Sequence, residues 1–119
     1  MEDLFRQNML FDFYSEVLTQ RQQEICRMHL QEDWSLGEIA EEMNISRQAV
    51  SDALKHSFQA MEKAESKLHT VERFLLIQKQ IDVLEELLDQ DADKAQIKEQ
   101  IQTLREAALL EEPGDTNGI

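Results

Sequence analysis

Two helix-start signals with a helix-stop signal between them constrain the fold of this chain more than any other feature. Ser35-Leu36-Gly37-Glu38 has the Ser-x-x-Glu pattern of a capping box, in which the serine and glutamate side chains satisfy backbone N–H groups at a helix start. Asn44 can adopt the left-handed conformation that ends a helix, and Ser46 can cap a new helix beginning at Arg47. These signals predict two helices joined by a very short turn.

The apolar residues of the same segment fit two helices that cross at a steep angle. The residues expected to face inward are Ile39, Ala40 and Met43 on the first helix, Ile45 in the turn, and Val50 and Leu54 on the second helix. Ala40 is small at the point where the two helices must approach closely. The segment from Leu36 to Lys55 therefore predicts a helix-turn-helix, the motif that can place its second helix in the major groove of DNA.

The exposed face of the second helix decides what such a motif could read. Its candidate nucleic-acid contacts are Arg47, Gln48, Ser51 and Lys55. In this motif the N-terminal residues of the second helix approach base edges, where Arg pairs with guanine and Gln with adenine. Asp52 lies on the same face and would oppose phosphate binding unless it meets cytosine or pairs with Lys55.

Charge argues against strong binding of the chain to any polyanion. The net charge is -13, and residues 35–58 alone carry four acidic and two basic side chains. Affinity for nucleic acid depends on Lys and Arg side chains that neutralise phosphates. DNA, RNA and protein therefore all remain open as ligands of the predicted motif.

The rest of the sequence predicts further helices, since the chain has only 3 Gly and 1 Pro to make turns. Thr19-Gln20-Arg21-Gln22 is another capping box and opens a helix that runs to about Leu30. Before it, a helix within residues 4–18 is expected to bury one apolar face: Leu4, Phe5, Met9, Leu10, Phe13 and Val17. The helix that begins at Arg47 has no clear stop before Lys63–Thr70.

Two coiled-coil seams near the C-terminus predict an αα-hairpin. The first seam is Phe74, Ile77, Ile81, Leu84 and Leu88, and the second is Ile97, Ile101, Leu104 and Ala108. Asp89–Asp93 fits a turn that ends in an N-cap. We expect a helix-turn-helix domain over 1–67, a hairpin over 68–110 that packs on the first domain or forms a homodimer, and a disordered acidic tail over 111–119.

Several kinds of site have no support in the sequence. His29, His56 and His69 are far apart, and neither metal ligands nor a cofactor-binding loop can be assigned. Cys26 is the only cysteine, which excludes an intramolecular disulfide and favours a role as buried apolar filler. With no catalytic constellation, signal peptide or membrane span in view, we expect a cytoplasmic protein that is not an enzyme.

The chain also resembles known bacterial proteins. Leu18-Thr19, Ser35–Glu41 and Ile45–Ser51 are similar to the region-4 helix-turn-helix of sigma factors, over roughly residues 15–60. Met9–Tyr14, Leu18–Gln22 and the acidic helical C-terminal part make the whole chain resemble the small YlxM-like family. That resemblance implies an all-α fold with a nucleic-acid-binding motif.

It also implies a regulatory role in the signal recognition particle pathway, because genes of this family neighbour those of the particle's protein components. The alternative is an adaptor that binds the particle's protein or RNA component without binding DNA.

Overall fold

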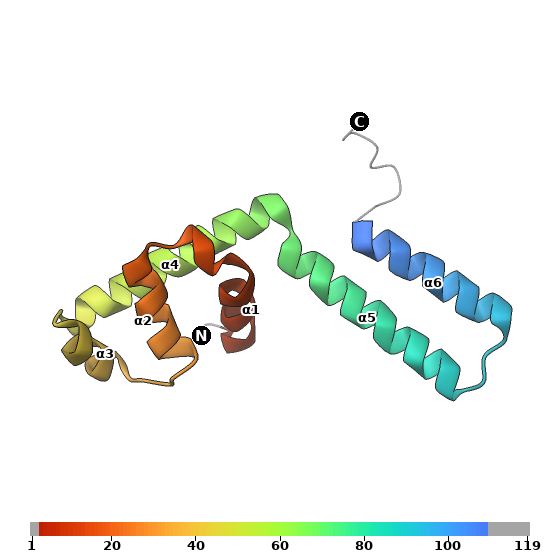
Figure 1. Cartoon of the computed structure of the whole chain (residues 1–119), viewed down its shortest axis with the longest axis horizontal. Coiled ribbons are helices and arrows are strands. Elements are labelled where there is room, and N and C mark those ends of the chain that lie inside the picture. Colours follow the sequence, from red (N-terminus) through yellow and green to blue (C-terminus); the bar gives the residue numbers. More distant parts are fainter. Residues whose placement is uncertain (1–2, 110–119) are drawn as a thin grey trace. The chain divides into compact units, whose positions relative to one another are not determined.

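The chain consists of helices and short connections over residues 3–109, the part that the computed structural model describes (Figure 1). The elements in chain order are α1 (Leu4–Tyr14), the 3-10 turn η1 (Ser15–Val17), α2 (Gln20–Leu30), α3 (Leu36–Met43), α4 (Arg47–Leu68), α5 (Thr70–Asp89) and α6 (Lys94–Leu109). The predicted all-α class is confirmed. The acidic tail expected over 111–119 lies outside the described residues.

Internal contacts divide the chain into two units where His69 meets Thr70. The first unit contains α1 to α4, and the second contains α5 and α6. Helix α4 ends at Leu68, where His69 adopts the left-handed conformation with φ 55° and its N–H donates to the carbonyl of Glu65. The end of α4, which the sequence left open, is thus set by a left-handed cap.

Helix α4 is the scaffold of the first unit, because α1, α2 and α3 all contact it. Its buried positions recur every three or four residues, as expected for one helix face: Val50, Leu54, Ser57, Met61 and Glu65. Helices α1 to α3 and the connection before α2 complete the apolar core with Leu10, Phe11, Tyr14, Leu18, Ile25, Cys26, Ile39 and Ala40. Cys26 is fully buried, and burial raises the pKa of its thiol.

Helix α1 buries a different face from the one that the sequence predicted. The buried residues of α1 are Gln7, Leu10, Phe11 and Tyr14, so Leu10 is buried as predicted, whereas Leu4, Phe5 and Phe13 of α1 and Val17 of η1 are exposed. Two polar contacts accompany this rotation. The Tyr14 hydroxyl donates to the Glu65 carboxylate at 2.5 Å, and Arg6 forms an ion pair with Glu62. The prediction failed because apolar spacing alone does not reveal polar partners on α4.

The second unit is a hairpin of α5 and α6, which contact each other extensively. Asp91 lies in the turn with φ 55°, and Asp93 caps α6 by accepting from the N–H of Gln96 at 2.9 Å. The Gln96 side chain in turn accepts from the N–H of Asp93 at 3.2 Å. The predicted turn with an N-cap is confirmed.

The predicted seam positions Ile77, Ile81 and Leu84 of α5 are half-buried, whereas the seam of α6 differs from the prediction. On α6 the half-buried positions are Ile97, Gln100, Thr103, Leu104 and Ala107, whereas Ile101 and Ala108 are exposed. The Gln100 amide donates to the Gln80 carbonyl at 3.1 Å and to its side-chain oxygen at 2.7 Å. This polar pair occupies the contact line, and two of the four expected apolar positions of α6, Ile101 and Ala108, are exposed.

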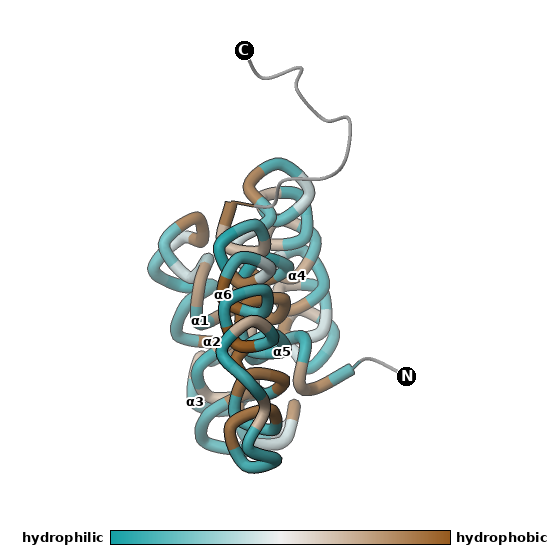
Figure 2. The backbone as a smooth tube through the Cα atoms, turned by 90° about the vertical axis from the view of Figure 1, so that its right-hand side faces the viewer, coloured by the Kyte–Doolittle hydropathy of each residue, from teal (hydrophilic) through white to brown (hydrophobic). Residues whose placement is uncertain are grey.

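The tube in Figure 2 shows apolar and polar residues alternating along the turns of the helices. Among residues 3–109, no helix is long and apolar enough to cross a membrane.

Candidate nucleic-acid interface

The start of α3 is closed by the capping box that the sequence predicted. The Ser35 hydroxyl accepts from the N–H of Glu38 at 3.1 Å, and the Glu38 carboxylate accepts from the N–H of Ser35 at 2.8 Å. The bond from the Ser35 backbone, with a smaller effect of its hydroxyl, lowers the pKa of Glu38. The capping box therefore defines the residue at which α3 begins.

The turn between α3 and α4 is tight and left-handed. Asn44 has φ 56° and ψ 49°, and the N–H of Ile45 donates to the Ala40 carbonyl at 3.0 Å. The Ser46 hydroxyl then accepts from the N–H of Ala49 at 3.0 Å and caps α4. Asparagine tolerates this conformation better than most residues, so the structure confirms both the predicted stop and the predicted restart.

The two helices of the motif pack as the sequence predicted at most positions. Ile39 and Val50 are fully buried, and Ala40 and Leu54 are each 7% exposed. Met43 and Ile45 are only half-buried. The pair of α3 and α4 is therefore a packed helix-turn-helix.

All four candidate contacts lie exposed on α4: Arg47, Gln48, Ser51 and Lys55. They are not equivalent, because the Gln48 amide donates to the Asp52 carboxylate at 3.0 Å. Asp52 is thus held by Gln48, and no ion pair joins it to Lys55 within the described chain. A base that accepts a hydrogen bond from the Gln48 amide would have to compete with the Asp52 carboxylate for it.

Arg47 lies across Gly37, the second residue of α3. A Cβ atom placed on Gly37 would lie 2.9 Å from a terminal nitrogen of the Arg47 guanidinium and 3.2 Å from its central carbon. The bare backbone of Gly37 therefore leaves room for this arginine at the surface of the motif. The sequence analysis did not predict this contact, although Gly37, the only glycine between the two predicted helix starts, could have indicated it.

Helix α4 also carries a longer row of exposed polar side chains, which we call the α4 row. Its members repeat at every fourth position: Arg47, Ser51, Lys55, Gln59, Lys63 and Lys67. Residues four apart are neighbours on one helix face. The α4 row contains four cations and no carboxylate, and sequence reasoning identified only its first half.

Each carboxylate on α4 has a polar contact of its own. Asp52 accepts from Gln48, and Glu65 is buried against the Tyr14 hydroxyl. Glu62 accepts two bonds from the Arg6 guanidinium, at 2.6 and 2.7 Å, and these bonds are the largest cause that lowers the pKa of Glu62. Only Glu62 is paired with a cation, whereas the bonds from the neutral Gln48 amide and Tyr14 hydroxyl do not neutralise Asp52 and Glu65.

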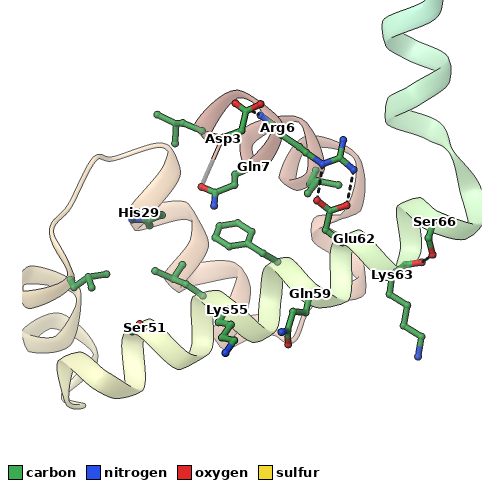
Figure 3. A pocket seen from close by; sticks show the side chains of 15 residues that line it. Asp3, Arg6, Gln7, His29, Ser51, Lys55, Gln59, Glu62, Lys63 and Ser66 are labelled. Carbon is green, nitrogen blue, oxygen red and sulfur yellow. Dashed lines mark hydrogen bonds and ion pairs between the residues drawn. The ribbon is translucent and has the colours of Figure 1, made fainter. Parts of the chain in front are cut away.

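A groove of about 980 Å³ lies between α1 and α4, and His29 and Leu36 also line it. Figure 3 shows Arg6 on α1 reaching across to Glu62 on α4 beside this groove. Its apolar lining is Leu4, Leu10, Leu36, Leu54 and Phe58. Ser51 and Lys55 line the groove, whereas Arg47 and Gln48 do not. The four candidate residues thus share a helix but not one pocket.

The chain is similar to a large set of bacterial proteins. The model of the family UPF0122, described as "Putative helix-turn-helix protein, YlxM / p13 like", matches residues 1–106. The UPF0122 protein lin1916 of Listeria innocua is 39% identical over 101 residues, which is 84% of this chain and 92% of the relative. The UPF0122 protein OB1530 of Oceanobacillus iheyensis is 42% identical over 101 residues, with 85% and 92% covered.

The similarity covers both units of the chain. The UPF0122 protein BH2485 of Halalkalibacterium halodurans is 36% identical over 107 residues, which is 90% of this chain and 94% of the relative. The resemblance to YlxM-like proteins is thereby confirmed, and the packed α3–turn–α4 pair agrees with the printed description of the family. The chain belongs to the UPF0122 family of YlxM/p13-like helix-turn-helix proteins.

Proposed function

We propose that this protein is a non-enzymatic regulatory protein that binds nucleic acid through the exposed side of α4. Arg47, Gln48 and Ser51 would approach bases, while Lys55 and the later cations of the α4 row would contact phosphates. Membership of a helix-turn-helix family supports this proposal. The net charge of -13 predicts that the affinity is modest and falls steeply with salt.

The observation that carries the proposal is the α4 row itself. Its cations at positions 47, 55 and 63 are each eight residues apart, a spacing of about 12 Å at 1.5 Å per residue. No carboxylate interrupts this row, and the carboxylates elsewhere on α4 are bonded to other side chains. Each step of eight residues also turns about 80° around the helix, so neighbouring cations of the row can face one strand of a polyanion, whereas Arg47 and Lys63 face different directions.

A salt titration tests the proposal. We would measure binding of the Arg47→Ala/Lys55→Ala variant to a fluorescent DNA duplex and to an RNA hairpin of equal length. Losing two phosphate contacts should lower the slope of log affinity against log salt by about 1.8 for the duplex. If only one of the two is a phosphate contact, as expected when Arg47 reads a base, the slope should fall by about 0.9.

The matched control is Lys79→Ala/Lys94→Ala, which removes two exposed cations from the second unit. This control should keep the slope of the unaltered protein. An unchanged slope in the α4 variant, or an equal loss in the control, would refute the proposed interface.

As a second candidate, we propose an adaptor that binds the protein or RNA component of the signal recognition particle. The observation that favours it is the groove between α1 and α4, whose lining includes the apolar Phe58 and the cationic Lys55. Such a groove can accept an apolar segment of a protein partner.

The test is a pull-down with the particle's protein subunit, in buffer treated with nuclease, comparing the unaltered chain with Phe58→Ser. Loss of capture on nuclease treatment alone would show that RNA bridges the contact. Capture that resists nuclease but fails with Phe58→Ser would support the groove. A helical circular-dichroism spectrum would check that this variant is folded.

A further inference from the structure

The groove between α1 and α4 and the α4 row share side chains. Members of the row that also line the groove are Ser51, Lys55, Gln59 and Lys63. Figure 3 shows Lys55, Gln59 and Lys63 one after another along α4. A ligand that fills the groove would therefore lie beside cations that the proposed function assigns to phosphates.

The apolar side chains that line the groove differ in exposure. Leu10 and Leu54 belong to the core of the first unit, whereas Leu4 is 57% and Leu36 is 37% exposed. Phe58 also lines the groove and is half-buried. Removing apolar surface from water is the main favourable contribution to protein association. The groove therefore offers apolar surface that a partner could cover.

The length and walls of the groove favour a helix as its occupant. The groove is lined along α4 from Ser51 to Ser66, which is about 22 Å, or roughly four helical turns, at 1.5 Å per residue. Its walls α1 and α4 are helices whose backbone groups bond within the helix, so an extended peptide would find no strand edge to pair with. A partner helix satisfies its own backbone and can lay an apolar stripe into such a groove.

The charges that line the groove indicate the chemistry of that helix. The carboxylates among its described lining residues are Asp3 and Glu62. Glu62 forms an ion pair with Arg6, and Asp3 caps α1 by accepting from the N–H of Arg6 at 3.3 Å. Lys55 and Lys63 form no ion pair with any described residue. Two cations on α4 are thus left for a partner, although the whole chain has a net charge of -13.

We infer that the groove binds an amphipathic helix of a partner protein that carries carboxylates beside its apolar stripe. Lys55 and Lys63 are eight residues apart, about 12 Å along α4. Carboxylates about two turns apart on a helix that lies along α4 can therefore meet both ammonium groups, which long flexible stems carry. The bound helix then keeps nucleic acid from Lys55 and Lys63. This competition rests on the proposed function, whereas binding of the helix does not.

Fluorescence polarisation on the full chain tests the inference with two labelled synthetic peptides. Each is a helix of about four turns with a leucine stripe; the first has two glutamates beside the stripe, two turns apart, and the second has lysines there. The unaltered protein should bind the glutamate peptide more tightly. Lys55→Glu/Lys63→Glu should weaken that binding about tenfold or more and strengthen binding of the lysine peptide. The matched control, Lys79→Glu/Lys94→Glu in the second unit, should leave both affinities unchanged.

A second pair of variants tests the apolar side of the groove. Leu4→Ser/Leu36→Ser alters two exposed residues, so the fold should be retained, and it should weaken binding of the glutamate peptide. Leu75→Ser/Leu109→Ser, which alters two exposed residues of the second unit, should not.

Competition is measured by adding unlabelled glutamate peptide to the unaltered protein bound to a fluorescent DNA duplex or RNA hairpin, which the peptide should displace. No binding of the glutamate peptide, equal binding of the two peptides, or equal losses in the control variants would overturn the inference. Peptide binding that leaves nucleic-acid binding unchanged would overturn the competition. If the peptide binds as expected and neither nucleic acid does, the proposed function fails while the assignment of the groove is supported.

Discussion

Removing the Tyr14 hydroxyl is the sharpest test of how α1 is held on α4. Tyr14 is 4% exposed and Glu65 is 6% exposed, and the hydroxyl donates to the carboxylate at 2.5 Å. In Tyr14→Phe the ring keeps its packing, while a buried carboxylate loses a donor. A hydrogen bond to a charged group contributes about 1.5–3 kcal/mol, so the first unit should lose about 2 kcal/mol.

Urea unfolding followed by tryptophan fluorescence measures this loss. Trp34 is the only tryptophan and lies between α2 and α3, so its signal reports on the first unit. With a urea dependence of about 1 kcal/mol per molar, the midpoint should fall by roughly 2 M. Comparing Tyr14→Phe, Glu65→Gln and the double variant isolates the coupling between the two side chains. A midpoint shift below about 0.5 M, or a coupling near zero, would refute this reasoning.

Three smaller changes test other contacts. Gly37→Ala should leave the free energy of unfolding in urea unchanged or raise it by up to about 1 kcal/mol, because alanine favours helices. The same change displaces the Arg47 side chain and should alter nucleic-acid affinity. An unchanged affinity would contradict a role for Arg47 in its position over Gly37. Asn44→Ala should cost about 1 kcal/mol in the same assay because of its positive φ, and Asn44→Gly should not. Arg6→Ala should cost under about 1 kcal/mol at pH 7, since both partners are nearly half exposed, and less as the pH falls through the lowered pKa of Glu62.

The sign of that pH effect follows from Glu62. Its pKa is lowered in the folded state, mainly by its hydrogen bonds to Arg6. The ion pair therefore adds stability above the pKa of Glu62 in the unfolded chain, and this contribution is lost as the pH falls through the folded pKa. A loss in Arg6→Ala that grows towards low pH would contradict this assignment.

Local signals in the sequence predicted the helix ends well. Ser35, Asn44 and Ser46 act on backbone groups within four residues, so their effect can be deduced without knowing the fold. The capping boxes at Thr19 and Ser35 are both present in the structure, each with its two reciprocal bonds.

Contacts between distant segments could not be predicted in this way. The rotation of α1 goes with bonds from Arg6 to Glu62 and from Tyr14 to Glu65, pairs more than fifty residues apart in sequence. The hairpin register likewise includes a contact of Gln80, which no apolar pattern marks. For the candidate site, exposure of the four α4 residues followed from periodicity, but the position of Arg47 over Gly37 did not.

The length of α4 has a consequence for how sequences of this kind can vary. Its first turns carry Arg47 and Ser51, and its later turns hold α1 through Glu62 and Glu65. Inserting or deleting one residue between Ser51 and Glu62 would rotate the later turns by about 100° relative to the earlier ones. We therefore expect length changes among relatives to fall in the connections before α3 and α6, while α4 keeps its number of residues.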